Sequence, residues 1–168
     1  MRMWLTLPAT KRDITVTITD GTNPIEGASV TIEGTTETTD SDGEADFELY
    51  DGLQTATVTA TGYLDATETF DISEHDTGFT IELTKVDTIT ITVTDSEDSP
   101  SAIEGATVVI GETSKTTDSN GECTFTNMPY DDYEATVSAT GYVTKEEVEI
   151  AFRSNHKSFT VALEADEP

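Results

Sequence analysis

Apolar and polar residues alternate along most of this chain with a period of two. Threonines separate Ile14, Val16 and Ile18, and the same spacing recurs through the sequence at 28–32, 45–49, 56–60, 79–83, 89–93, 106–110, 123–125, 133–139 and 159–163. Strict alternation over a few residues is typical of a strand with one buried face, whereas a helix repeats its apolar residues three and four positions apart. No segment has the helical spacing, so we predict an all-β protein.

The second half of the chain repeats the first. IEGASVTI at 25–32 returns as IEGATVVI at 103–110, and TTDSDGEADF at 38–47 returns as TTDSNGECTF at 116–125. ATGY at 60–63 and FTIEL at 79–83 also have counterparts, at 139–142 and 159–163. A repeat of this length marks a structural unit. We therefore predict a module at 13–85, a second at 86–168, and a segment at 1–12 that belongs to neither.

Each predicted module has six or seven short strands with turn residues between them. Strands that alternate in this way bury one face, and the buried face needs a second sheet to pack against. The expected architecture is therefore two tandem Greek-key β-sandwiches, each with a thin core of its own.

Several glycine and aromatic positions of the two copies follow a known pattern. The first copy has Gly27-Ala28-x-Val30, Thr39-Asp40-x-x-Gly43-x-x-Phe47 and Val58-x-Ala60-x-Gly62-Tyr63, and the second has Gly105-Ala106-x-Val108, Thr117-Asp118-x-x-Gly121-x-x-Phe125, Tyr133-x-Ala135-x-Val137 and Gly141-Tyr142. This pattern resembles the carboxypeptidase regulatory-like and related Cna-B-type modules. The resemblance implies a seven-stranded, transthyretin-like or immunoglobulin-like β-sandwich that serves as a spacer, stalk or interaction module, without catalytic activity. The first copy departs from the pattern at Gln54, where a tyrosine is expected.

Cna-B-type modules often carry an isopeptide crosslink between a first-strand lysine and a last-strand asparagine or aspartate, beside a buried acid. The core-facing positions of the corresponding segments hold only isoleucine, valine, phenylalanine and leucine in this chain. We therefore expect no such crosslink.

The chain is strongly acidic, with 34 carboxylates against 8 basic side chains and a formal net charge of −26. Phosphate backbones and anionic membranes repel such a surface, so neither nucleic acid nor membrane is an expected partner. Molar salt screens this self-repulsion, and the composition favours a halophilic source over an ordinary acidic surface protein. The single cysteine, Cys123, excludes an internal disulfide bond. No signal peptide or transmembrane segment is visible.

Two acidic turns are weak candidates for binding a cation. Asp40 and Asp42 precede Gly43, and Asp118 and Asn120 stand at the same places in the second copy. Calcium favours several oxygen ligands around a sharp glycine turn, but a complete calcium loop would offer more of them. A plain β-turn, with the side chains accepting bonds from the backbone and the glycine at positive φ, explains both copies without metal.

No catalytic or cofactor-binding set can be assembled from this sequence. His75 and His156 lie in polar stretches one residue out of register between the copies, which is typical of solvated loop residues. Cys123 replaces Ala45 of the first copy at a core-facing position, so we expect a buried thiol. The chain is therefore expected to act without an active site and without cofactors.

The segment at 1–12 holds the only tryptophan and three of the eight basic residues. It could be a disordered terminus or an extra edge strand of the first module. The alternative is a docking arm, because tryptophan and arginine are typical interface anchors and a basic segment suits an acidic partner. The residues that would dock are Arg2, Trp4, Leu5, Leu7, Lys11 and Arg12.

These observations predict a structural or interaction protein that binds other subunits of an assembly and forms a homo-oligomer. The specific hypothesis is a virion component, such as a capsid decoration, turret or tail protein, of a virus of a halophilic archaeon. A cell-surface adhesin or stalk module is one alternative. A carbohydrate-binding module is another, and it would need an exposed aromatic platform, for which Tyr50, Tyr63, Tyr130 and Tyr142 are candidates. The expected location is a virion or an extracellular surface.

Overall fold

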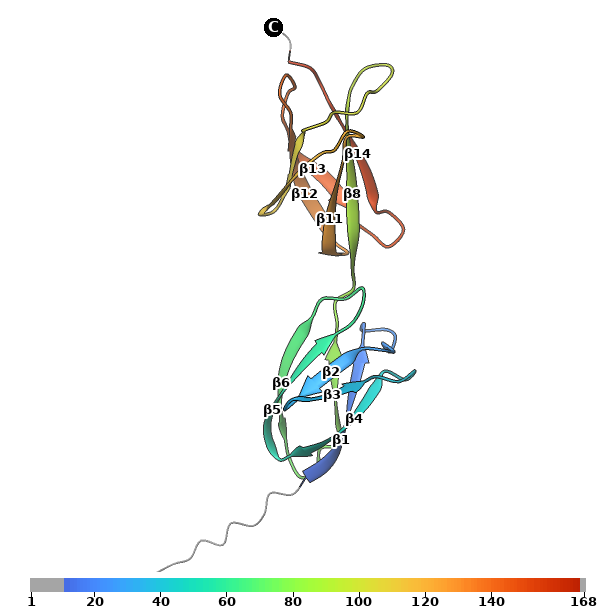
Figure 1. Ribbon diagram of the computed structural model, residues 1–168, viewed down its shortest axis with the longest axis vertical. Coiled ribbons are helices and arrows are strands. Elements are labelled where there is room, and N and C mark those ends of the chain that lie inside the picture. Colours follow the sequence, from blue (N-terminus) through green and yellow to red (C-terminus); the bar gives the residue numbers. More distant parts are fainter. Residues whose placement is uncertain (1–10, 167–168) are drawn as a thin grey trace, which may run out of the picture. The chain divides into compact units, whose positions relative to one another are not determined.

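The computed structural model describes residues 11–166, and they fold into two compact units that divide between Lys85 and Val86 (Figure 1). We call them module 1 and module 2. The described part of the chain consists of strands and connecting turns, and it holds no helix that could cross a membrane. The predicted all-β class is confirmed.

Each module has seven strands in the same order. Those of module 1 are β1 (Lys11–Thr19), β2 (Ser29–Ile32), β3 (Thr35–Thr38), β4 (Glu44–Tyr50), β5 (Gly52–Thr59), β6 (Ala66–Ile72) and β7 (Gly78–Glu82). Those of module 2 are β8 (Val86–Asp95), β9 (Thr107–Ile110), β10 (Thr113–Thr116), β11 (Glu122–Pro129), β12 (Asp132–Ser138), β13 (Lys145–Ala151) and β14 (Ser158–Leu163).

The strands of each module form a three-stranded and a four-stranded sheet. Their orders are β4-β1-β7 and β3-β2-β5-β6 in module 1, and β11-β8-β14 and β10-β9-β12-β13 in module 2. The first strand pairs antiparallel with the fourth and parallel with the last, so β1 lies between β4 and β7. This pairing brings the two ends of each module together in one sheet and produces the predicted sandwich.

The core of each module follows the period-two pattern. The buried residues of module 1 include Ile14, Val16, Ile18, Val30, Ile32, Phe47, Leu49, Val58, Ile81 and Leu83, and those of module 2 include Ile89, Ile91, Val93, Val108, Ile110, Phe125, Val137, Val161 and Leu163. Threonines occupy most of the positions between them, because β-branched side chains suit the exposed face of a strand. The predicted register of these strands is confirmed.

Two buried threonines fix the connection between the sheets in the same way in both modules. Thr39 Oγ1 donates to the carbonyl oxygen of Ile25 at 2.6 Å and accepts from the amide of Ala28 at 2.9 Å. In module 2, Thr117 bonds to Ile103 and Ala106 at 2.7 and 2.9 Å. A buried hydroxyl is tolerated because both of its hydrogen-bonding functions are satisfied. These threonines therefore have a structural role.

Strand β1 includes Lys11 and Arg12, which precede the module boundary predicted at 13. Lys11 pairs with Tyr50 and Arg12 with Leu49 in the β1–β4 ladder. Both residues therefore belong to a strand of the sandwich, although the sequence pattern assigned them to the preceding arm. The rest of that arm, residues 1–10, lies outside the described residues.

Candidate functional site

The two acidic turns are β-turns held by their own aspartates. Asp40 Oδ1 accepts bonds from the amides of Asp42 and Glu44 at 2.9 and 3.0 Å. Asp118 Oδ1 accepts the equivalent bonds from Asn120 and Glu122, both at 2.9 Å. The bonds from these amides lower the pKa of Asp118. One carboxylate oxygen in each turn is thus committed to the backbone, and no cluster of three potential metal-ligating side chains occurs among the described residues.

Glycine is required in both turns for two reasons. Gly43 and Gly121 have φ values of 75° and 72°, in the left-handed region that other residues avoid. A Cβ atom would also lie 2.6 Å from the carbonyl oxygen of Ile18 in the first turn, and 2.5 Å from that of Val93 in the second. The turns therefore lie directly against the central strand of the three-stranded sheet.

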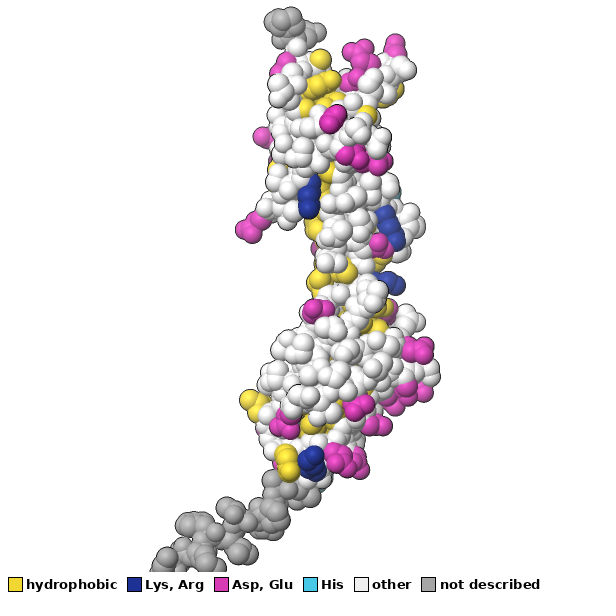
Figure 2. Space-filling view, in the orientation of Figure 1, with side chains coloured by type: hydrophobic (Ala, Val, Ile, Leu, Met, Phe, Trp, Pro, Cys, Tyr) yellow, Lys and Arg dark blue, Asp and Glu magenta, His cyan; other side chains and the backbone are white. Residues whose placement is uncertain are grey.

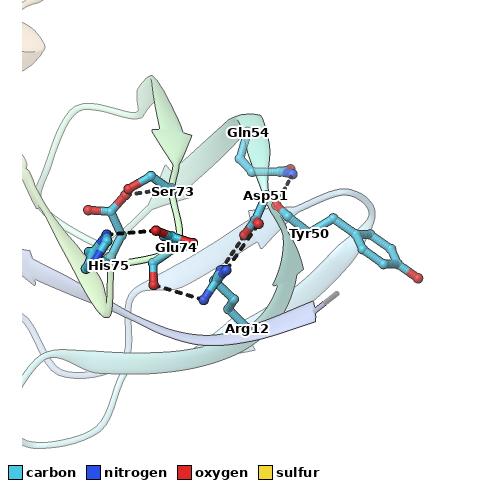
Figure 3. A network of polar contacts seen from close by, with 8 residues as sticks. Arg12, Tyr50, Asp51, Gln54, Ser73, Glu74 and His75 are labelled. Atoms are coloured by element: carbon cyan, nitrogen blue, oxygen red, sulfur yellow. Dashed lines mark hydrogen bonds and ion pairs between the residues drawn. The ribbon is translucent and has the colours of Figure 1, made fainter. Parts of the chain in front are cut away.

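A polar network ties together the end of module 1 at which β1 begins (Figure 3). We call this end, formed by the start of β1, the β4–β5 hairpin and the β6–β7 loop, the entry pole of the module. Arg12 forms a two-pronged ion pair with Asp51, in which Nη2 lies 3.2 Å from Oδ2, and Arg12 Nη1 donates to the carbonyl oxygen of Glu74 at 3.0 Å. The hydrogen bond raises the pKa of Arg12 and lowers that of Asp51. One first-strand side chain thus holds two loops.

The entry pole of module 2 repeats this network with the charges exchanged. Asp87 occupies the position of Arg12 in the strand register. Lys11 pairs with Tyr50 in module 1, and Val86 pairs with the equivalent Pro129 in module 2. Asp87 forms an ion pair with Lys157 of the β13–β14 loop and accepts a bond from the Tyr130 hydroxyl at 2.9 Å. A residue of the first strand again binds both the β11–β12 hairpin and the β13–β14 loop, so the two entry poles have the same arrangement.

Hydrogen bonds from Lys157, the Thr88 amide and Tyr130, in that order, lower the pKa of Asp87 to about 2. The bond to Asp87 also raises the pKa of Lys157. The sequence pattern did not bring this lysine and this aspartate together, although they join the first strand to the last loop. Their side chains are 33% (Asp87) and 41% (Lys157) exposed, and each stabilises the charged form of the other. The structure therefore holds them as a surface ion pair.

We expect the Asp87 network to contribute a pH-dependent part of the stability of module 2. A carboxylate whose folded pKa is about 2, against an ordinary value of 3.8, stabilises the fold above pH 4. That contribution is lost as the pH falls through the folded pKa. Thermal melts of the wild type and Asp87→Asn from pH 5 to about pH 2 should therefore differ most at pH 5 and converge near pH 2. A constant difference across this range would contradict the ion pair.

Gln54 has the same role as its counterpart in module 2. Gln54 Nε2 donates to the carbonyl oxygen of Tyr50 at 3.2 Å, and the Tyr133 hydroxyl donates to that of Pro129 at 2.8 Å. Each donor reaches a carbonyl four residues earlier and closes the hairpin at the entry pole. The departure from the family pattern at Gln54 therefore preserves the hydrogen bond.

The four tyrosines proposed as an aromatic platform have different surroundings. Tyr63 and Tyr142 pack partly against the cores, and the ring centroid of Tyr130 lies 5.0 Å from that of Phe152. Only Tyr50 among the four is exposed, at 41%. These side chains do not form a shared flat surface within either module.

The histidines and the cysteine lie apart from one another. His75 is largely exposed and lies 3.7 Å from a Glu74 carboxylate oxygen, whereas His156 packs against the ring of Phe159. Cys123 is buried as predicted, and desolvation raises the pKa of its thiol. His75, His156 and Cys123 therefore do not form a catalytic set with one another.

Of the six predicted docking residues, the structure describes only Lys11 and Arg12. The guanidinium of Arg12 binds Asp51 of its own module, so the carboxylate that it was expected to find on a partner lies within its own sandwich. Lys11 Nζ lies 5.4 Å from the centre of the Tyr50 ring, in cation-π contact. Arg2, Trp4, Leu5 and Leu7 lie outside the described residues.

Comparison with known families supports the predicted resemblance for module 2. Residues 88–164 match the carboxypeptidase regulatory-like domain, so the match covers nearly all of that module. Module 1 has the same strand order and the same buried threonine and glycine turn. No curated protein matches the chain.

Several solved structures are similar over most of the chain. The Bacillus anthracis TIE protein is 24% identical over 92% of this chain, with a TM-score of 0.43. A streptococcal ancillary pilin is 15% identical over 95%, with a TM-score of 0.48, and the minor pilin GBS52 of Streptococcus agalactiae is 14% identical over 93%, with a TM-score of 0.49. The chain covers 34%, 63% and 97% of these three proteins. At these identities the similarity concerns the fold.

Proposed function

We propose that this chain is a non-enzymatic structural subunit of an extracellular assembly, to which it contributes two rigid β-sandwich modules. The observation that carries the proposal is the use of its polar side chains. The polar side chains repeated in both copies, such as Thr39 and Thr117 or Asp40 and Asp118, bond to the backbone of their own module. Among the described residues, no buried polar side-chain atom lacks a hydrogen-bond partner. Polar side chains used in this way stiffen the modules and are not available for catalysis, which supports a structural role.

The assembly that we propose is a virion of a halophilic archaeal virus, with this chain as a capsid decoration, turret or tail protein. The acidic surface supports a high-salt setting, and Figure 2 shows acidic side chains spread over the visible face of both modules with few basic ones between them. A cell-surface adhesin or stalk is the second candidate, because the same rigid modules would serve it. Quantitative mass spectrometry of purified particles and of cell envelopes from one culture separates the two. Enrichment in the envelope would overturn the virion assignment.

We expect stability to rise with ionic strength well beyond 0.1 M, because the net charge of −26 repels itself across thin cores. The Debye length falls from about 10 Å at 0.1 M salt to about 3 Å at 1 M. Thermal melts in increasing KCl should show a rising midpoint, with sucrose at matched osmolality as the control for solvent exclusion. A melting midpoint that does not change with KCl concentration would remove the support for a halophilic source.

We further propose that residues 1–10 are the segment that attaches this chain to its assembly. They hold Trp4 and Arg2, which are typical interface anchors, and they lie outside the repeat that defines the two modules. Deletion of residues 1–10 should leave the melting temperature of both modules within about 2 °C of the wild type, a shift well below that of a core substitution. The same deletion should abolish incorporation into particles.

Single substitutions refine this test. Trp4→Ala should reproduce much of the deletion, because tryptophan is a typical interface anchor, whereas Thr6→Ala serves as the control within the same segment. If the deletion unfolds module 1 and spares attachment, residues 1–10 are part of that sandwich.

A further inference from the structure

The exposed large apolar side chains of the described residues are confined to the ends of the modules. They are Tyr50, Leu53, Leu64 and Val143, with exposed fractions of 41%, 74%, 39% and 48%. Tyr50 and Leu53 flank the β4–β5 hairpin, while Leu64 and Val143 each follow a Gly-Tyr pair between the fifth and sixth strands. The outward positions along the strands hold mostly threonine, aspartate and glutamate.

The entry pole of module 1 places a lysine beside apolar surface, while its other cation, Arg12, is surrounded by the carboxylates of Asp51, Glu74 and Asp76. Leu53 is the most exposed of the four apolar side chains, and Tyr50 lies beneath the ammonium group of Lys11. Register places Asp132 of module 2 at the position of Leu53, since Ile32 pairs with Ala56 and Ile110 with Ala135. The apolar patch is therefore specific to module 1 and is not needed for the fold.

Module 2 has a patch of complementary character at its opposite end, which we call the exit pole. Val143 donates its amide proton to the carbonyl oxygen of Glu164 at 2.8 Å, and Asp166 donates to that of Gly141 at 2.9 Å. The side chains of Glu164 and Asp166 are exposed on the segment beside Val143. An exposed valine is thus joined through its backbone to a segment that carries two exposed carboxylates.

We propose that the chain associates with itself head to tail, with the entry pole of module 1 in one copy docked on the exit pole of module 2 in the next. Leu53 and Tyr50 would cover Val143, and Lys11 would face Glu164 and Asp166. This inference rests on the proposed structural function and names one surface through which it operates. In each interface, one copy uses the entry pole of its module 1 and the other uses the exit pole of its module 2. Each copy keeps the other of these two poles free, so the contact can repeat.

The distribution of charge favours association of two copies through their poles over association along the sides of the modules. Two copies that meet side by side bring carboxylate-rich strands together, and each chain carries a net charge of −26. The entry pole of module 1 is mixed in charge, and its Lys11 stands over Tyr50 of the apolar pair Tyr50 and Leu53, on the side that would face Val143 and its neighbouring acids. A second copy of the chain is therefore the partner that we propose, because the chain itself carries both contact surfaces.

Sedimentation velocity of the full chain in molar KCl, over a range of concentrations, tests the proposal. Leu53→Asp and Val143→Asp should each weaken self-association by at least about tenfold, because each places a carboxylate in the apolar centre of the contact. Leu64→Asp is the matched control, since it makes the same change at the equivalent of Val143 in module 1, and it should leave association unchanged. Leu53→Asp should fold normally, because module 2 has aspartate at that position.

Mixing the two variants identifies the geometry. Leu53→Asp keeps an intact exit pole and Val143→Asp keeps an intact entry pole, so their mixture should form pairs but no larger species. A head-to-head contact would respond to Leu53→Asp alone, and that result would overturn the proposal. A wild type that stays monomeric at every concentration would overturn it as well.

Deletion of residues 1–10 separates this inference from the proposed function. If the deletion abolishes association while both pole variants associate as the wild type does, residues 1–10 form the contact and the pole interface is wrong, but the structural function stands. If the pole variants lose association and still enter particles, the poles act in self-association and attachment depends on another surface.

Discussion

Phe125→Ala is expected to destabilise module 2 by about 3–5 kcal/mol, through the lost transfer free energy of the ring and the cavity that it leaves. Phe125 is 2% exposed and is, with Phe152, one of the two buried phenylalanines in the core of module 2. A loss of this size is a large part of the stability of a small domain, so module 2 should unfold before module 1. Calorimetry should show one transition move to lower temperature and the other stay in place.

Phe47 in module 1 provides the reciprocal experiment. It is 4% exposed and occupies the equivalent position, so Phe47→Ala should move the other transition by a similar amount. Thr124→Ala, on the exposed face of the same strand as Phe125, is the control and should change stability by less than about 0.5 kcal/mol. A melt of Phe125→Ala within a degree of the wild type would show that the assigned core is wrong.

Gly121→Ala is expected to destabilise module 2 by about 3 kcal/mol or more, because two effects add. The positive φ of 72° is unfavourable for alanine by about 1–2 kcal/mol, and the new Cβ would lie 2.5 Å from the carbonyl oxygen of Val93. That oxygen is part of the strand backbone and accepts a bond from the Ile103 amide, so it cannot move without breaking the connection. Chemical denaturation should show a lower midpoint with an unchanged slope.

Gly105 offers a control with nearly the same backbone conformation. Its φ is 76°, but a Cβ atom there would meet no other atom within 4 Å, so Gly105→Ala should be unfavourable by only about 1–2 kcal/mol. The difference between the two variants isolates the steric effect of the strand. Equal losses would show that the turn does not lie as close to Val93 as the structure has it.

The core was predictable from sequence because one face of most strands is fully buried. Ile14, Val16 and Ile18 all lie on such a face, and their spacing identifies it. The edge strands β6 and β13 were not predicted, since each has a single fully buried residue, Ile72 or Ile150, near its end. Alternation does not show in a strand whose other residues face solvent or lie at the seam between the sheets.

The polar networks were less predictable, since they depend on where loops fall in space. Asp87 and Lys157 are separated by 70 residues and meet only because the first and last strands are neighbours. Gln54 shows a different difficulty. The sequence suggests that the hydrogen bond of the family's tyrosine is lost at this position, but Gln54 makes an equivalent bond to the carbonyl oxygen of Tyr50. Arg12 was assigned to the arm because the repeat begins after it, yet its partner Asp51 lies within module 1.

The parallel pairing of the first and last strands determines how each module responds to mechanical force. The ladder runs from Thr15 and Gly78 to Thr19 and Glu82 in module 1, and from Thr90 and Ser158 to Asp95 and Leu163 in module 2. Tension on the two ends of a module pulls these strands past each other, so the hydrogen bonds of the ladder bear the load together as a shear. A ladder pulled open from one end would yield one bond at a time. Each sandwich is therefore built to transmit tension along its strands without unravelling.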